Sequence, residues 1–171
     1  MSDIEVEQYE QAMKNYQDII AKIDEQSGIF YKQYNAGNDI SEEYLNNIYI
    51  LYNQLIGIKF PEKYVDLYNE LIYAKIVYGL SNDFAYIAFD PILDENVGNY
   101  FPPNEIGEYI KQLEDQLYNK SYVPKNNINI DFEQIYYKII QEYYKDNKSV
   151  SEVYDELSEI FYNKDFLQRF N

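Results

Sequence analysis

The chain has 171 residues, with 30 Asp and Glu against 14 Lys and Arg, which gives a formal net charge of −16. It contains no His and no Cys, so disulfides, zinc sites with Cys or His ligands, and catalysis by a Cys or His nucleophile or base are excluded. With 46% hydrophobic residues at this length, we expect a folded protein with one domain over residues 1–171.

Apolar and aromatic residues recur alternately every three and four positions from residue 6 to residue 34, which predicts one helix of about eight turns. Gly37 is expected to end this helix, and Asp39 or Ser41 to cap a second one. Pro61 suits the first turn of a third helix. That helix is apolar on two faces, so we expect it to be the central buried element, with a continuation toward Asp90 as one alternative.

Residues 90–103, DPILDENVGNYFPP, contain three of the five prolines and show no clear period, so we expect an ordered irregular loop there. Further helices are predicted over residues 104–120, from Asp131 and from Ser149, the last two opening with capping residues. A terminal turn is expected over DFLQRF. Together these elements predict an all-α fold, a single-domain bundle of five or six helices.

Tyrosine is strongly enriched, at 22 residues, and a single Arg stands beside many Lys, Ile and Asn residues, which indicates a low-GC coding source. That bias favours Lys, so it does not explain the acidity. The N-terminal sequence MSDIEVEQYEQ is acidic where a signal peptide is basic and then apolar. No stretch approaches the roughly 18 apolar residues of a membrane helix. We therefore expect a leaderless cytoplasmic protein, with a processed extracytoplasmic fragment as the alternative.

Carboxylates, Lys, Tyr and Ser remain as catalytic candidates, and two carboxylates alone can hydrolyse a glycoside. With 30 acidic residues in one small protein, some pair always has suitable spacing, so the pattern singles out no active site. One acidic string, with Asp94, Asn96, Gly98 and Glu105, resembles the ligand positions of an EF-hand loop but lacks the glycine at the sixth position. We predict no enzymatic activity, no cofactor and no metal site. An enzyme with a carboxylate of raised pKa in a closed cleft is the third hypothesis.

The helix predicted from Ser149 carries Glu152, Asp155, Glu156 and Glu159, spaced so that all four project from its outer face. Their rise between steps is about 4.5 to 6 Å, and nucleic-acid phosphates form a comparable periodic negative array. A solvated outer face is the alternative interpretation. The net charge of −16 nevertheless exceeds the roughly 2 to 8 that suits a small domain, and a basic partner would relieve the self-repulsion. Direct binding of nucleic acid or of an anionic membrane is disfavoured.

These features predict a non-enzymatic inhibitor that acts as a nucleic-acid mimic and blocks the basic nucleic-acid-binding surface of a protein partner. Aromatic side chains among carboxylates suit such an interface. In composition the chain is similar to phage-encoded inhibitors such as anti-CRISPR proteins and to immunity proteins. The predicted partner-binding residues are Glu152, Asp155, Glu156, Glu159, Asp90, Asp94, Glu95, Tyr100 and Phe101. The tyrosines expected on the surface are Tyr49, Tyr73, Tyr86, Tyr118, Tyr122, Tyr137, Tyr144 and Tyr162.

Residues 55–74, LIGIKFPEKYVDLYNELIYA, resemble the helix-Pro-helix segment of small helical envelope lipoproteins from low-GC Gram-positive bacteria. In that segment a hydrophobic-Pro-acidic-x-Tyr turn, here around Pro61 and Tyr64, is followed by Leu at helical spacing. The lipobox cysteine of such proteins is absent. The resemblance implies an alternative function as a helical cell-envelope module, with no site residues assigned.

Overall fold

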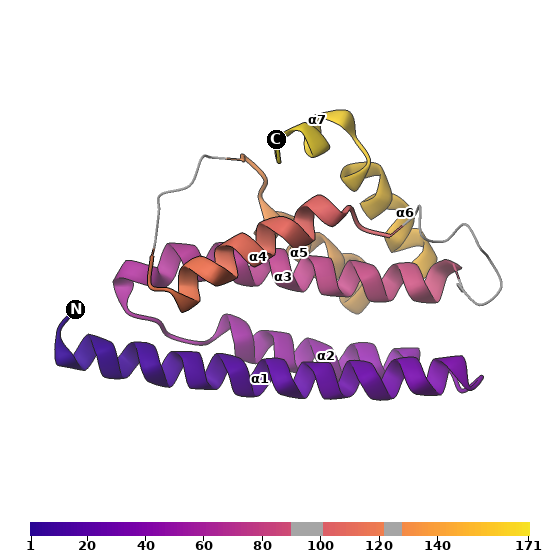
Figure 1. Cartoon of the computed structure of the whole chain (residues 1–171). Coiled ribbons are helices and arrows are strands. Elements are labelled where there is room, and N and C mark those ends of the chain that lie inside the picture. Colours follow the sequence, from indigo (N-terminus) through magenta and orange to yellow (C-terminus); the bar gives the residue numbers. More distant parts are fainter. Residues whose placement is uncertain (90–100, 122–127) are drawn as a thin grey trace. The chain divides into compact units, whose positions relative to one another are not determined.

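Figure 1 shows the computed structural model of the chain, which describes residues 1–89, 101–121 and 128–171. In these residues we find helices and their connections and no strand, which confirms the all-α helical bundle. The chain divides into two compact units, Met1–Asn69 and Glu70–Asn171. Helix α3 (Glu62–Phe89) contributes residues to both. The expectation of a single domain over residues 1–171 stays a prediction.

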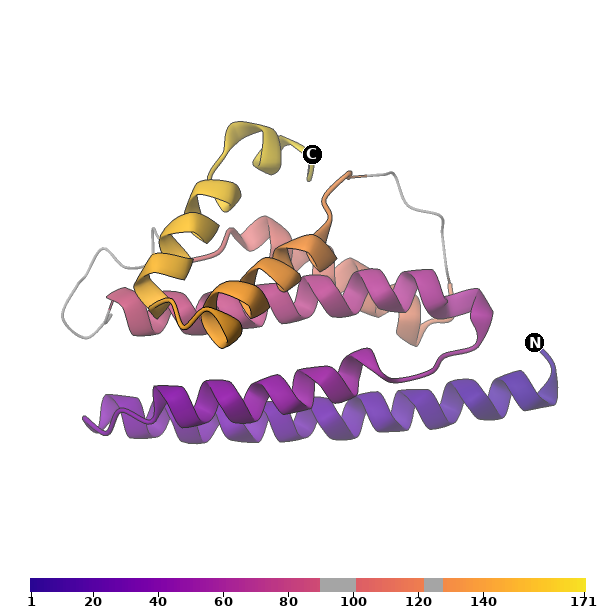
Figure 2. The same cartoon turned by 180° about the vertical axis from the view of Figure 1, so that it is seen from behind.

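The first unit contains α1 (Asp3–Asn35), α2 (Ser41–Ile56) and the first turns of α3. Helices α1 and α2 run antiparallel, side by side, in both views (Figures 1 and 2). A capping box between Ser2 and Glu5 begins α1, and Gly37, with a φ of 88°, follows its end in the left-handed conformation that glycine adopts without strain. The N-cap residue of α2 is Ile40, which has no capping side chain, so the expectation of Asp39 or Ser41 as the cap was wrong; Asp39, one residue earlier, accepts a hydrogen bond of 2.9 Å from the Ser41 amide.

Aromatic side chains fill the core of the first unit. The rings of Phe30 and Tyr44 stack with centroids 4.3 Å apart, which joins α1 to α2. Tyr16 and Tyr68 pack edge to face at 5.9 Å, and the Tyr68 hydroxyl donates a hydrogen bond of 2.6 Å to the Leu55 carbonyl. Burial raises the pKa of Tyr68 well above its ordinary value, so this hydroxyl stays protonated. Tyr68 is therefore a core residue with a satisfied polar end.

The second unit contains the rest of α3, then α4 (Asn104–Tyr118), α5 (Phe132–Ile139), the π-helix η2 (Ile140–Lys145), α6 (Val150–Phe161) and α7 (Lys164–Gln168). Helices α4 and α5 pass on either side of α3, as the two opposite views show (Figures 1 and 2). The helices expected over residues 104–120, from Asp131 and from Ser149 are present as α4, α5 and α6, and the expected terminal turn is the short helix α7.

Helix α3 is continuous to Phe89, and its residues in the second unit are largely inaccessible to solvent. Leu71 has no exposed surface, which confirms that this helix is a central buried element. Helix α4 approaches α3 closely at Gly107, where a Cβ atom would lie 3.2 Å from the Tyr78 hydroxyl. Lys75 and Glu114 form an ion pair of 2.7 Å between the same two helices.

Some burial expectations were wrong. Tyr73 is buried, at 9% exposure, because its ring packs on Tyr136 of α5 at 5.5 Å. Val65 lies on α3, which we expected to be apolar on two faces, but it is 37% exposed. Of the other tyrosines expected on the surface, Tyr118, Tyr137 and Tyr162 are exposed, Tyr49, Tyr86 and Tyr144 are half-buried, and Tyr122 lies outside the described residues. The loop expected over residues 90–103 also lies outside them, except for its last three residues.

Candidate functional site

Helix α6 carries four of the predicted partner-binding residues. The Ser149 side chain caps this helix by accepting a hydrogen bond of 3.1 Å from the Glu152 amide. Val153, Tyr154, Leu157 and Phe161 are fully buried on one side. Glu152, Asp155 and Glu159 are exposed, and α6 contains no Lys or Arg. The helix therefore presents three accessible carboxylates without a basic residue of its own among them, and we call these three residues the acidic face of α6.

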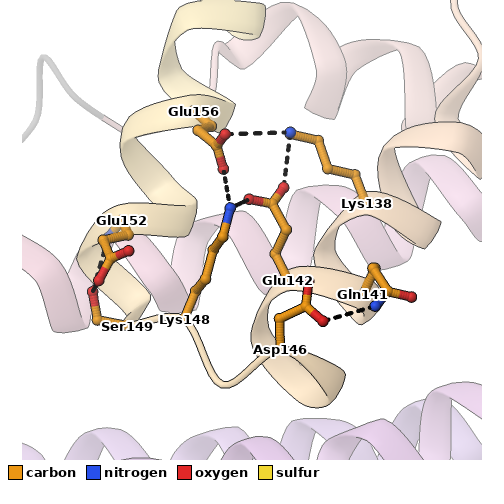
Figure 3. A network of polar contacts seen from close by, with 8 residues as sticks. All are labelled: Lys138, Gln141, Glu142, Asp146, Lys148, Ser149, Glu152 and Glu156. Carbon is orange, nitrogen blue, oxygen red and sulfur yellow. Dashed lines mark hydrogen bonds and ion pairs between the residues drawn. The ribbon is translucent and has the colours of Figure 1, made fainter.

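Glu156 differs from the other three acidic residues because two lysines compensate its charge. The Lys138 ammonium lies 3.6 Å from Glu156 Oε1, and the Lys148 ammonium lies 3.9 Å from Oε2 (Figure 3). Lys138 comes from α5, and Lys148 comes from the turn between η2 and α6. The structure therefore places Glu156 in an internal ion-pair network, at the edge of the acidic face.

The centre of this network is Glu142, whose side chain is only 9% exposed. Lys138 Nζ lies 2.8 Å from Glu142 Oε2, and Lys148 Nζ donates a hydrogen bond of 2.7 Å to Oε1 (Figure 3). Burial alone would raise the pKa of Glu142, but the contacts with the Lys138 and Lys148 ammonium groups outweigh it and lower the pKa to about 2. Glu142 is therefore ionised at neutral pH, and the two carboxylates and two ammonium groups have no net charge.

The π-helix η2 explains why a glutamate occupies a buried position. The Asp146 amide donates to the Gln141 carbonyl five residues earlier, at 2.8 Å, so the turn holds one residue more than an α-helical turn. The α-helical stripe predicts Tyr143 inside, but Tyr143 is half-buried and Glu142 takes the inner position. Asn147, with a φ of 57°, then reverses the chain, and Asn tolerates this conformation better than most residues.

Glu152 also has a local structural role. The Ser149 hydroxyl donates to Glu152 Oε1 at 3.1 Å, so this carboxylate takes part in the cap of α6 (Figure 3). A negative charge in the first turn of a helix is favourable because it faces the positive end of the helix dipole. Asp155 and Glu159 take part in none of the ion pairs among the described residues.

The other predicted residues come from the segment before α4. Asp90, Asp94, Glu95 and Tyr100 lie outside the described residues. Phe101 is described and half-buried, and its carbonyl accepts a hydrogen bond from the hydroxyl of Tyr162, the residue that ends α6.

On the other side of that segment, Phe89 packs edge to face on Tyr154 of α6 at 5.6 Å. The described residues on both sides of 90–100 therefore contact α6.

An open hollow with a volume of about 630 Å³ lies beside the acidic face, and we call it the α6–α7 hollow. Its walls come from α5, the end of α6 and α7. Carboxylates, two basic groups and apolar side chains all contribute to it. The lining residues are Lys138, Glu156, Glu159, Ile160, Asn163, Asp165, Phe166 and Arg169.

The described residues offer no group of three or more acidic side chains arranged to hold a metal ion. Within residues 1–89, 101–121 and 128–171, none of the helices combines the length and apolar character that a membrane span needs. The acidic face of α6 offers charge and hydrogen bonding at an exposed helix surface, next to a hollow of mixed polarity.

Comparison with known proteins adds no family to this description: no family model, no curated protein and no solved structure matches the chain.

The sequence did not identify Lys138, Glu142 and Lys148 as part of the site. The spacing of Lys138 and Glu142 is that of neighbours one helical turn apart, and this pattern could have indicated an ion pair. The contact of both lysines with Glu156 depends on how η2 and α6 pack, which no local spacing encodes.

Proposed function

We propose that the protein is a non-enzymatic inhibitor that binds the basic nucleic-acid-binding surface of a protein partner through the acidic face of α6. One observation carries the proposal: Glu152, Asp155 and Glu159 are exposed on a helix without a basic residue. Successive carboxylates on such a face recur about every 4.5 to 6 Å along the helix. A groove that holds a phosphate backbone could accept this array.

The net charge supports the same proposal. A formal charge of −16 on a protein of this size repels nucleic acid and anionic surfaces and attracts basic ones from a distance. Attraction of this kind raises association rates and weakens as salt is added. An anti-defence protein or an immunity protein, acting in the cytoplasm of the cell that makes it or of a viral host, would have these properties.

The alternative, a helical cell-envelope module, rests on the segment around Pro61 and Tyr64. Pro61 is buried just before α3, and Tyr64 packs on Tyr9 with ring centroids 5.3 Å apart. Both positions serve the turn and the core, as in any helical protein. No described feature favours the envelope module over the inhibitor.

Affinity capture tests the proposal. The bait is the full chain, offered to lysates of the source cell and, if the gene is viral, of its host. The test variant removes three charges by Glu152→Gln, Asp155→Asn and Glu159→Gln. The matched control removes three exposed charges on α4 and α5 by Glu108→Gln, Asp115→Asn and Glu133→Gln.

We expect the wild type and the control to retain a nucleic-acid-handling protein that salt releases, and the test variant to lose it. Equal capture of that protein by the test variant would contradict a role for the acidic face. Capture of envelope components alone would support the alternative function.

A further inference from the structure

We propose that Tyr73 of α3 and Tyr137 of α5 form an oxidative modification site, at which hydrogen peroxide and a haem peroxidase join the two rings by a dityrosine bond. The product is a covalent link between two helices of the second unit. Because these helices are far apart in the sequence, the link also constrains the unfolded chain and stabilises the fold. This chemistry is separate from the proposed binding through the acidic face.

Three tyrosines, Tyr73, Tyr136 and Tyr137, meet where α5 lies against α3 (Figure 2). The centroid of the Tyr73 ring is 5.5 Å from that of Tyr136 and 6.5 Å from that of Tyr137. The side chains of Tyr73 and Tyr137 are also joined by a hydrogen bond. The hydroxyl and the ortho carbons share one end of a phenol ring, so this bond brings ortho carbons of the two rings close together. Those carbons are the atoms that a dityrosine bond joins.

The two rings differ in their access to an enzyme. Tyr137 is 55% exposed, so a peroxidase can take an electron from it while solvent takes its proton. Tyr73 is 9% exposed, which is too little for direct contact with the haem edge of an enzyme. Burial, together with the hydrogen bond to Tyr137, raises the pKa of Tyr73, so this phenol is protonated at neutral pH and donates to Tyr137. A radical on Tyr137 can therefore take a hydrogen atom from Tyr73 along that bond.

The reaction consists of two one-electron oxidations. The first removes an electron and a proton from Tyr137, and transfer of a hydrogen atom from Tyr73 then leaves the radical on Tyr73. The second makes Tyr137 a radical again, and the two radicals form a carbon–carbon bond between their ortho positions. The hydrogens of those two carbons move to the phenol oxygens, which restores both hydroxyls. In sum, two hydrogen atoms leave the protein and reduce one hydrogen peroxide to two waters.

The composition of the chain favours coupling within one molecule. The sequence has no Cys and no Trp, the side chains that compete best for one-electron oxidation. The net charge of −16 makes copies of the protein repel one another, which slows coupling between exposed tyrosines of different molecules. The pairs Tyr9–Tyr64 and Tyr16–Tyr68 have similar ring distances, 5.3 and 5.9 Å, but both rings of each pair are buried, so neither offers an entry point for the oxidant.

The test uses the full-length chain in dilute solution at low salt, treated with a haem peroxidase and a limiting amount of hydrogen peroxide. Denaturing gel electrophoresis separates the monomer from crosslinked copies, and the monomer is then digested with trypsin. A bond between Tyr73 and Tyr137 joins the tryptic peptides 64–75 and 126–138. Mass spectrometry identifies the joined peptide, whose mass is that of the two peptides less two hydrogen atoms.

Four variants assign the bond to its two residues. Tyr73→Phe and Tyr137→Phe each keep a ring and remove the hydroxyl that becomes a radical. Tyr136→Phe tests whether the neighbouring ring is the true partner. Tyr118→Phe is the matched control, because Tyr118 is 45% exposed and lies on α4. Melting curves by circular dichroism establish that each variant is folded, and if Tyr73→Phe is not, the exposed site Tyr137→Phe decides.

We expect the joined peptide in the monomer of the wild type, of Tyr136→Phe and of Tyr118→Phe, and its complete loss in Tyr73→Phe and Tyr137→Phe. Persistence of the joined peptide in Tyr137→Phe would overturn the proposal, and so would its loss in Tyr136→Phe or in Tyr118→Phe. Dityrosine that forms only between copies of the wild type, or not at all, would also overturn it.

Discussion

Lys148 and Glu142 are joined twice, once through the main chain and once through their side chains. The Lys148 amide donates to the Glu142 carbonyl at 2.9 Å, and the Lys148 ammonium donates to the Glu142 carboxylate at 2.7 Å. The two bonds close the turn that leads from η2 into α6. Lys148 and Lys138 also reach Glu156. The Glu142 carboxylate therefore holds in place the two ammonium groups that compensate Glu156 at the edge of the acidic face.

Replacing Glu142 should destabilise the fold. Glu142→Gln leaves two ammonium groups with Glu156 as their remaining partner in the network and puts an amide in a buried position. We expect a loss of about 1 to 3 kcal/mol in the free energy of unfolding. The larger cost of about 3 to 5 kcal/mol for a fully buried pair does not apply, because the lysine side chains are 35% and 39% exposed and can turn to water. Urea denaturation measures the change. The control is Glu133→Gln, at an exposed site on α5, whose free energy of unfolding should stay within about 0.5 kcal/mol of the wild-type value. Equal midpoints for the two variants would show that the network adds nothing.

The free energy of unfolding should change with pH in the acidic range and in the alkaline range, and little near neutral pH. The folded-state pKa of Glu142 is lowered to about 2, so its contribution is complete above the ordinary pKa of 4.5 and is lost as the pH falls toward 2. Burial raises the pKa of Tyr109 to about 12, so its contribution is complete below the ordinary value of 10 and is lost as the pH rises toward 12. The chain has no His, the side chain that would titrate near neutral pH. Urea midpoints across this pH range check the profile, and Glu142→Gln should flatten the acid side. A steep change between about pH 6 and 8 would contradict this account.

The helical pattern of the sequence predicted most of the fold because the inward stripes are long and regular. In α1, Tyr9, Tyr16 and Phe30 lie on the expected stripe and are buried. The sequence does not decide whether α3 continues to Phe89, since Gly79 lowers helix propensity and packing against neighbouring helices settles the outcome.

The candidate site was less predictable. Glu152, Asp155 and Glu159 are exposed as the spacing indicated. The ion pairs of Glu156 depend on the π-helical turn, which moves Glu142 inward by adding one residue to the turn. A period of 3.6 residues assigns that inner position to Tyr143, so the pattern that predicted the helix also gave the wrong buried residue.

Leu71→Ala tests the central position of α3. Leu71 has no exposed surface, and removal of a buried leucine side chain leaves a cavity. We expect a loss of about 2 to 5 kcal/mol in the free energy of unfolding, measured by urea denaturation. Val65→Ala is the control on the same helix, because Val65 is 37% exposed and its truncation should cost much less. A urea midpoint of Leu71→Ala within error of the wild-type value would mean that α3 is not central to the core.

Salt should stabilise the isolated protein. Raising NaCl from about 10 mM to 1 M shortens the Debye length from about 30 Å to about 3 Å and screens the repulsion among 30 acidic groups. The Glu142 network opposes this trend weakly, because its central carboxylate is buried and less exposed to ions. We expect the melting temperature to rise. An unchanged or lower melting temperature would count against net self-repulsion.

Competition with nucleic acid tests the central claim most directly. The partner found by affinity capture is bound to labelled DNA or RNA at physiological salt, and the released label is measured as the protein is added. The wild type and the matched control, Glu108→Gln with Asp115→Asn and Glu133→Gln, should displace the nucleic acid. The acidic-face variant, Glu152→Gln with Asp155→Asn and Glu159→Gln, should fail while remaining folded, mainly because it associates more slowly. Displacement by the acidic-face variant at the wild-type concentration would contradict the claim that this face mimics a phosphate backbone.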